Sequence, residues 1–204
     1  MRSLRALCVL VAAAGLAEQS SAADPRYPDW PCAQAKVPEV SLAAVWNGPA
    51  LDDAAGNWRD DPKVGALVSR LAARRTPLDQ AEKAIVEFLS EAPAEKTERG
   101  KLLFKGLFET LNNERNTVMN GLERVTRKQR EAVDKVRSDT LELQAKQGEP
   151  TRDQAKVDEL SNQLVWETRI FEDRQRVIRF VCEVPTAIDQ RLFALGRVIQ
   201  QEME

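Results

Sequence analysis

Two pairs of neighbouring aspartates are the residues of this sequence that are best suited to acid–base chemistry. Asp52-Asp53 and Asp60-Asp61 each lie near a tryptophan, and glycan-cleaving sites combine two carboxyl groups about 5 to 10 Å apart with aromatic platforms. The same residues have a simpler use, because aspartates cap helices and favour turns. Asp61 directly precedes Pro62 and an apolar helical pattern. We therefore favour the structural role and assign no catalytic residue.

The composition excludes several other kinds of enzyme. The chain of 204 residues contains no histidine, which removes Ser-His-Asp and Cys-His catalysis and any zinc site built on imidazole. Its 9 glycines form no phosphate-binding loop. A formal net charge of −2 implies no general attraction to nucleic acid and at most weak contact with an anionic membrane surface. We expect no cofactor, no metal and no nucleic-acid partner.

A belt of basic residues is the best candidate for a binding surface. The segments RVTRKQR and TRIFEDRQRVIR supply it, and Trp166 lies beside the second segment. Such a belt can dock an anionic partner, but it is more commonly a solvated face with internal ion pairs. Exposure of Trp166 would favour a contact site, whereas burial would make it core filler. The candidates are Arg124, Arg127, Lys128, Arg130, Trp166, Arg169, Arg176 and Arg179.

Two long helices must position this belt. Apolar residues recur at alternating steps of four and three from Phe104 to Leu143 and again from Val157 to Ile199, which is the coiled-coil spacing. Folding the chain back at Glu149 pairs residues whose numbers add up to about 300, such as Leu122 with Ile178. The pattern predicts a long antiparallel hairpin over residues 94–204, with its tip near 148–150.

Polar residues interrupt both rows of this seam. They are Arg115, Gln129, Asp139, Glu167 and Arg174. One interpretation is that they fix the register of the pair at some cost in stability. The other is that the middle of the hairpin loosens to admit a partner helix.

A smaller base precedes the hairpin. Residues 61–93 read as two short helices, with Asp61 capping the first and Thr76 capping the second. Residues 24–60 form a strap rich in proline and tryptophan, whose Trp46 and Trp58 should fill the junction with the hairpin. The predicted fold class is therefore all-α: a coiled-coil-like hairpin, a base of two short helices and an N-terminal strap.

The N-terminus and the cysteines indicate an oxidising compartment. Residues 1–23 have the basic start, short apolar run and small residues of a secretory signal peptide, with cleavage expected after Ala23 or Ala22. Cys32 and Cys182 remain, and an even pair in an exported chain reads as a disulfide. A reactive or metal-binding thiol pair is the alternative. Pro185 should kink or break the second arm, so the bond would staple the strap to that kink.

Three short motifs indicate the same cellular compartment. DWPC, AAVW and LAARRTPLDQAEKAI resemble motifs in a family of exported, uncharacterised helical proteins from alphaproteobacteria. The resemblance implies a periplasmic location and no activity. We expect an interaction module, namely an adaptor, scaffold or chaperone-like protein whose hairpin contacts a protein partner in the cell envelope or a second copy of itself. The alternative is a histidine-free carboxylate hydrolase acting on cell-envelope material. A patch exposed on the arms favours the module, and a pocket where acids converge favours the enzyme.

Overall fold

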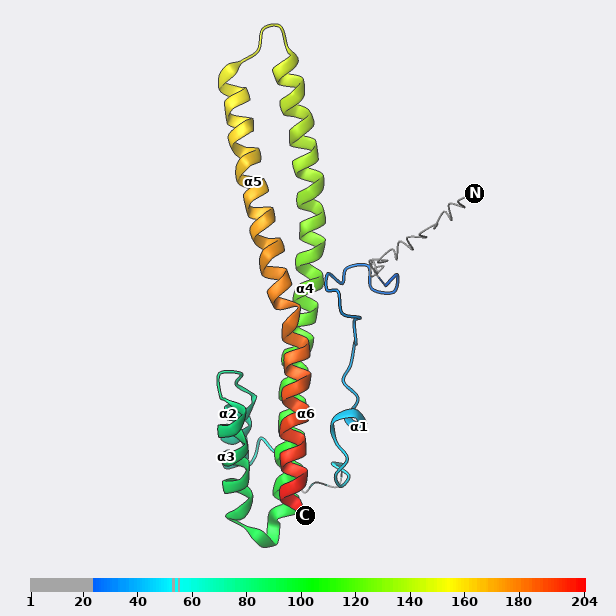
Figure 1. Cartoon of the computed structure of the whole chain (residues 1–204), viewed down its shortest axis with the longest axis vertical. Helices are drawn as coiled ribbons and strands as arrows, with labels where there is room; N and C mark the ends of the chain where they lie inside the picture. Colours follow the sequence, from blue (N-terminus) through cyan, green and yellow to red (C-terminus); the bar gives the residue numbers. More distant parts are fainter. Residues whose placement is uncertain (1–23, 53, 55) are drawn as a thin grey trace, which may run out of the picture.

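A computed structural model describes residues 24–52, 54 and 56–204, and the regular structure within them is entirely helical. The predicted signal peptide and Asp53 lie outside the described residues. Figure 1 shows a long hairpin with a small base at one end. The elements are α1 (Leu42–Val45), α2 (Pro62–Ala72), α3 (Leu78–Ser90), the 3-10 turn η1 (Pro93–Glu95), α4 (Lys96–Gly148), α5 (Gln154–Val181) and α6 (Glu183–Met203).

The hairpin consists of α4 on one side and of α5 followed by α6 on the other. With 53 residues, α4 is roughly 80 Å long at 1.5 Å per residue. The chain reverses at residues 149–153, and α5 and α6 return antiparallel to α4 (Figure 1). The register is the predicted one. Gln129 Nε2 donates to the carbonyl oxygen of Phe171 over 3.1 Å, and Leu122 shares a buried cluster with Ile178.

The returning arm is interrupted at Cys182, just before Pro185. A proline has no N–H to donate to the carbonyl one turn earlier, and its ring crowds that carbonyl, which here belongs to Val181. Cys182 nevertheless keeps helical backbone angles, with φ −59° and ψ −25°. The arm therefore kinks without forming a loop, and Figure 1 shows α5 leaning away from the line of α6.

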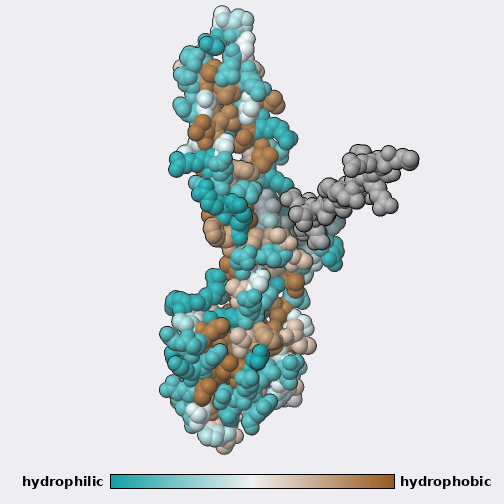
Figure 2. Space-filling model, in the orientation of Figure 1, coloured by the Kyte–Doolittle hydropathy of each residue, from teal (hydrophilic) through white to brown (hydrophobic). Residues whose placement is uncertain are grey.

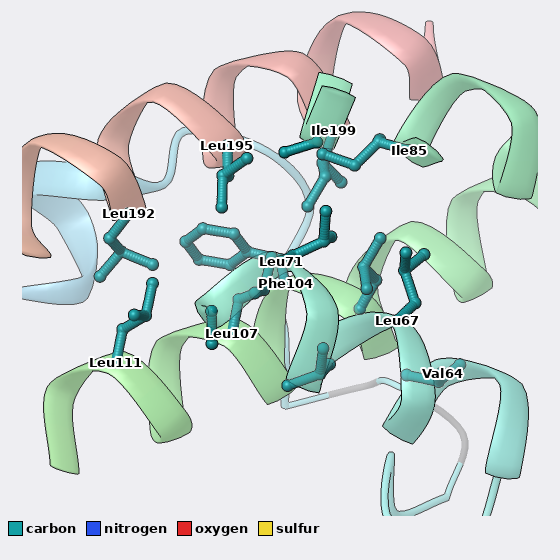
Figure 3. Close-up of a cluster of buried hydrophobic side chains, with 14 of the residues drawn as sticks. Val64, Leu67, Leu71, Ile85, Phe104, Leu107, Leu111, Leu192, Leu195 and Ile199 are labelled. Carbon is teal, nitrogen blue, oxygen red and sulfur yellow. The ribbon is translucent and has the colours of Figure 1, made fainter. Parts of the chain in front are cut away.

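The base has the only large hydrophobic core among the described residues. Helices α2 and α3 lie on one side of α4 and α6 (Figure 1), and Figure 3 shows their side chains meeting between the four helices. Trp46 stacks on Phe104 with ring centroids 4.2 Å apart, and Trp58 is buried in the same core, as predicted. The core residues drawn together include Val64, Leu67, Leu71, Ile85, Phe104, Leu107, Leu111, Leu192, Leu195 and Ile199.

The two short helices start differently from one another. Asp61 caps α2 as predicted, because its Oδ1 accepts hydrogen bonds from the backbone N–H groups of Lys63 and Val64 at 2.8 and 3.2 Å. The prediction that Thr76 caps α3 is wrong. Its hydroxyl instead donates to the carbonyl oxygen of Arg70 over 2.8 Å, so it closes the end of α2, while Pro77 takes the N-cap position of α3.

The strap runs along the hairpin and is fixed to it at the kink. Cys32 and Cys182 form the predicted disulfide, with their Cα atoms 5.5 Å apart. Trp30 and Cys32 pack against a small buried cluster that contains Leu122, Ile178 and Cys182. The staple therefore joins the strap to both arms at the point where the second arm bends.

Arg115 links the strap to both arms from inside the protein. Arg115 is buried, with only 2% of the residue exposed. Nε lies 2.8 Å from Asp189 Oδ1 on α6, and Nη2 donates to the carbonyl oxygen of Val37 over 2.7 Å. Burial raises the pKa of Asp189, although the charge of Arg115 opposes the rise. This polar interruption of the seam is a cross-link between three segments, as the register-fixing interpretation expects.

Removal of the disulfide should destabilise the protein measurably. The bond joins residues separated by 150 positions, and releasing so long a loop increases the entropy of the unfolded chain. We expect the Cys32→Ser/Cys182→Ser double variant to lose about 2–4 kcal/mol of unfolding free energy in urea titrations. Reduced wild-type protein should lose the same amount. An unchanged midpoint in both samples would contradict the structural role of the bond.

Candidate functional site

The basic residues nominated from the sequence do not act as one belt, because two of them hold the strap. Arg127 Nη1 lies 2.7 Å from Asp29 Oδ2. Arg130 pairs with the same carboxylate and also donates to the carbonyl oxygen of Pro28 over 3.0 Å. These hydrogen bonds, first from Arg127 and then from Arg130, hold the pKa of Asp29 below its usual range. Sequence reasoning missed Asp29 as their partner.

The other nominated residues lie in two places on the arms. Arg124 and Lys128 border a groove between α4 and α5. Arg169 and Arg176 lie on α5 beside a second recess between the arms, and Arg179 is exposed near the end of α5. Trp166 is 63% exposed, so it is not core filler.

The exposed side of α5 carries an unusual number of large apolar side chains. Val165, Trp166, Val177 and Phe180 are all more than half exposed, Phe180 to 73%. We call these four residues, with the interleaved Arg169 and Arg176, the outer stripe of α5. Figure 2 shows hydrophobic surface on the upper arms, next to hydrophilic residues. Exposed apolar groups that cluster on one element are typical of contact surfaces.

The groove between α4 and α5 is lined largely by apolar residues and has a volume of about 580 Å³. Sequence reasoning offered a loosened middle of the hairpin only as one of two interpretations and did not identify the residues that line this groove. The floor and walls are aliphatic, and the rim is mostly basic. The lining residues are Val118, Gly121, Leu122, Arg124, Val125, Lys128, Asp173, Arg174, Val177, Ile178 and Val181.

The ion pairs of the strap and the groove use different residues of α4. Glu123, Arg127 and Arg130 contact the strap through Lys36, Asp29 and Pro28. Gly121, Arg124 and Lys128 line the groove. At 100° per residue these two sets are centred roughly 125° apart around the helix. Trp30 and Cys32 of the strap pack against the buried cluster at the groove floor, but a Cβ at Gly121 would meet no atom within 4 Å, so the groove is open there.

The nominated carboxylates form no converging site in the part of the chain that is described. Asp61 is occupied as the cap of α2, Asp52 and Asp60 are exposed, and Asp53 lies outside the described residues. Among residues 24–52, 54 and 56–204 no group of three or more Cys, Asp or Glu side chains is arranged to hold a metal ion. None of the helices described is both long and apolar enough to cross a membrane.

The Asp29 contacts should make strap attachment sensitive to acid. The pKa of Asp29 is lower in the folded protein than in the unfolded chain, where it is about 3.9. The contacts of Asp29 therefore stabilise the attached strap fully above about pH 3.9, and this stabilisation is lost as the pH falls through the lower folded-state pKa. We expect hydrogen exchange of residues 24–31 to rise over that range. In Asp29→Asn the segment should exchange fast already at neutral pH. An acid transition of equal size in that variant would refute the assignment.

Two glycines of α4 should respond oppositely to alanine. A Cβ at Gly106 would lie 2.7 Å from Val68 Cγ2, whereas one at Gly121 meets nothing within 4 Å. We expect Gly121→Ala to raise the unfolding free energy by about 0.5–1 kcal/mol, since glycine weakens a helix interior. Gly106→Ala should lower it by about 1–3 kcal/mol through overpacking. Urea titration of both variants measures the difference, and destabilisation by Gly121→Ala would mean that the groove is not open.

Comparison with known proteins adds no assignment. No protein-family model, curated protein or solved structure matches the chain, so its function has to be argued from its own residues.

Proposed function

We propose that this protein is a periplasmic interaction module, an adaptor or scaffold whose hairpin arms contact a protein partner in the cell envelope. The observation that carries the proposal is the contrast between base and arms. The base buries its large apolar residues in a shared core, whereas the arms expose the outer stripe of α5 and leave an apolar groove open. Exposed apolar surface of this extent costs solubility unless a partner covers it.

The location rests on the cysteines and on the N-terminal sequence. A structural disulfide between Cys32 and Cys182 forms and persists in oxidising compartments such as the periplasm. The first 23 residues have the composition of a secretory signal. The resemblance of the DWPC and AAVW motifs to exported helical proteins agrees with this address.

The hydrolase alternative gains no support from the described carboxylates. Its proposed pairs would need two carboxyl groups facing one substrate. Asp61 is committed to the cap of α2, and the adjacent Asp60 is exposed. We therefore keep the interaction module as the single proposed function.

Site-specific cross-linking in cells tests this function. A photo-reactive amino acid replaces Arg169, within the outer stripe of α5, and in a matched control it replaces Glu82, which is exposed on α3 in the base. We expect a discrete protein adduct from position 169 and none from position 82. Adding Trp166→Ala and Phe180→Ala should remove most of the adduct, because buried aromatic anchors contribute about 2 kcal/mol or more each to an interface.

Two results would count against the proposal. Equal labelling from the base and the arms would indicate random collision. The absence of any adduct from position 169, in cells that export the protein normally, would remove the outer stripe as a contact surface.

A further inference from the structure

One face of α4 packs against α2 in the base and lines the groove in the arms. Its members recur at steps of three and four residues, which is the spacing of a single helix face. The first two border the end of α2, where Arg74 Nε lies 3.4 Å from Glu114 Oε1. The remaining four line the groove. In order they are Thr110, Glu114, Val118, Gly121, Val125 and Lys128.

The returning arm shows the same continuity. Ile188 and Leu192 of α6 are buried against the base helices, and Arg191 Nε donates to the carbonyl oxygen of Leu71 in α2 over 2.7 Å. Ile178 and Val181 extend this row past the kink and form the opposite wall of the groove. The groove is therefore the continuation, beyond the end of α2, of a surface on which this chain already packs α2 and α3.

The shape of the groove suits a helix. From Val118 to Lys128 its α4 wall is roughly 15 Å long, which corresponds to almost three helical turns. Gly106, in the covered part of the same side, allows α2 to approach so closely that a Cβ there would overlap Val68 and Trp58. Gly121 has open space above it. Gly121 would let an incoming helix approach α4 as closely as α2 does at Gly106. Alanine at this position would favour the helical state of α4 more than glycine does.

The charged residues at the rim indicate which residues an incoming helix should carry beside its apolar face. Within the described residues no ion pair joins Arg124, Lys128 or Arg174 to a carboxylate. The single acid of the rim, Asp173, pairs with Arg176 at 3.5 Å. The rim therefore presents an excess of positive charge around an apolar floor. A complementary occupant carries acidic residues on the borders of an apolar face.

We infer that the groove between α4 and α5 binds one amphipathic α-helix of a partner protein, with an apolar stripe seated over Gly121 and acidic residues facing Arg124, Lys128 and Arg174. This inference rests on the proposed function and specifies the class of partner. A planar lipid surface fits less well, because the apolar floor is recessed between two helices rather than displayed on a convex face.

A peptide derived from α2, the helix that packs on the same face of α4 in the base, tests the inference. The probe is a fluorescent, hydrocarbon-stapled peptide of residues 61–73, which contains the apolar face of α2, with Lys63→Glu, Ser69→Glu and Arg70→Glu. The control peptide keeps the native residues at these positions. Binding to the exported chain, residues 24–204, is followed by fluorescence anisotropy at low and at physiological salt.

The expected result is a charge-dependent complex in the groove. The acidic peptide should bind roughly tenfold or more tightly than the control peptide, and this preference should shrink with salt. Arg124→Glu/Lys128→Glu should reverse the preference, whereas the matched variant Arg169→Glu/Arg179→Glu, at arginines of α5 outside the groove lining, should leave it unchanged. Gly121→Trp fills open space, so it should weaken the acidic peptide at least roughly tenfold without lowering the melting temperature.

Other outcomes overturn the inference. Equal binding of the two peptides, no binding of either, or indifference to Gly121→Trp would each do so. A dimer in sedimentation that Gly121→Trp dissociates would identify a second copy as the occupant. Phosphatidylglycerol vesicles that bind wild-type protein but not Gly121→Trp would identify a lipid. If the arms cross-link a protein through position 169 while the peptide fails, this inference falls and the proposed function remains.

Discussion

A pair of helices buries only the seam between them, and this constraint shapes the whole molecule. Stable domains need at least two packed layers around a core, and a hairpin whose first arm has 53 residues cannot supply a second layer by itself. In the base α2 and α3 provide that layer, and the large buried cluster forms there. Beyond the end of α2 no described helix covers this face. Large apolar side chains of the arms are therefore exposed.

The strap covers another part of the hairpin. It crosses the hairpin where the second arm kinks, and three kinds of contact hold it: the disulfide to Cys182, the buried guanidinium of Arg115, and the ion pairs of Asp29 with Arg127 and Arg130. These contacts are placed at the middle of the hairpin, between the packed base and the open arms. They stabilise the register of the arms and leave the groove side free. The basic residues of α4 thus divide by helix face into a structural row and an open row.

Local patterns explain why some features followed from the sequence. Heptad spacing is repeated many times, so the pairing of Leu122 with Ile178 follows from it. Outside the predicted signal peptide the sequence has two cysteines, which allow a single intramolecular disulfide. A salt bridge between Asp29 and Arg127 spans 98 positions and leaves no periodic trace, so both residues looked like solvated charges. A loosened middle of the hairpin was one of two interpretations, but the groove could not be located from the sequence, because Val177 lies off the heptad row and Arg174 lies within it. The signal that could have revealed it is Gly121, an isolated glycine inside an uninterrupted helical pattern.

One face of the hairpin is closed by α2 in the base and open along the arms, and everything proposed for the groove depends on this difference. Thiol labelling of single cysteines on that face measures it, with Gly121→Cys in the groove and Leu107→Cys beneath the base helices. We expect a maleimide to react with position 121 at nearly the rate of an unfolded peptide. Position 107, which is fully buried, should react only as fast as the base opens. Strong protection of position 121 in the isolated protein would show that the face is already covered, and the groove could then not be a docking site.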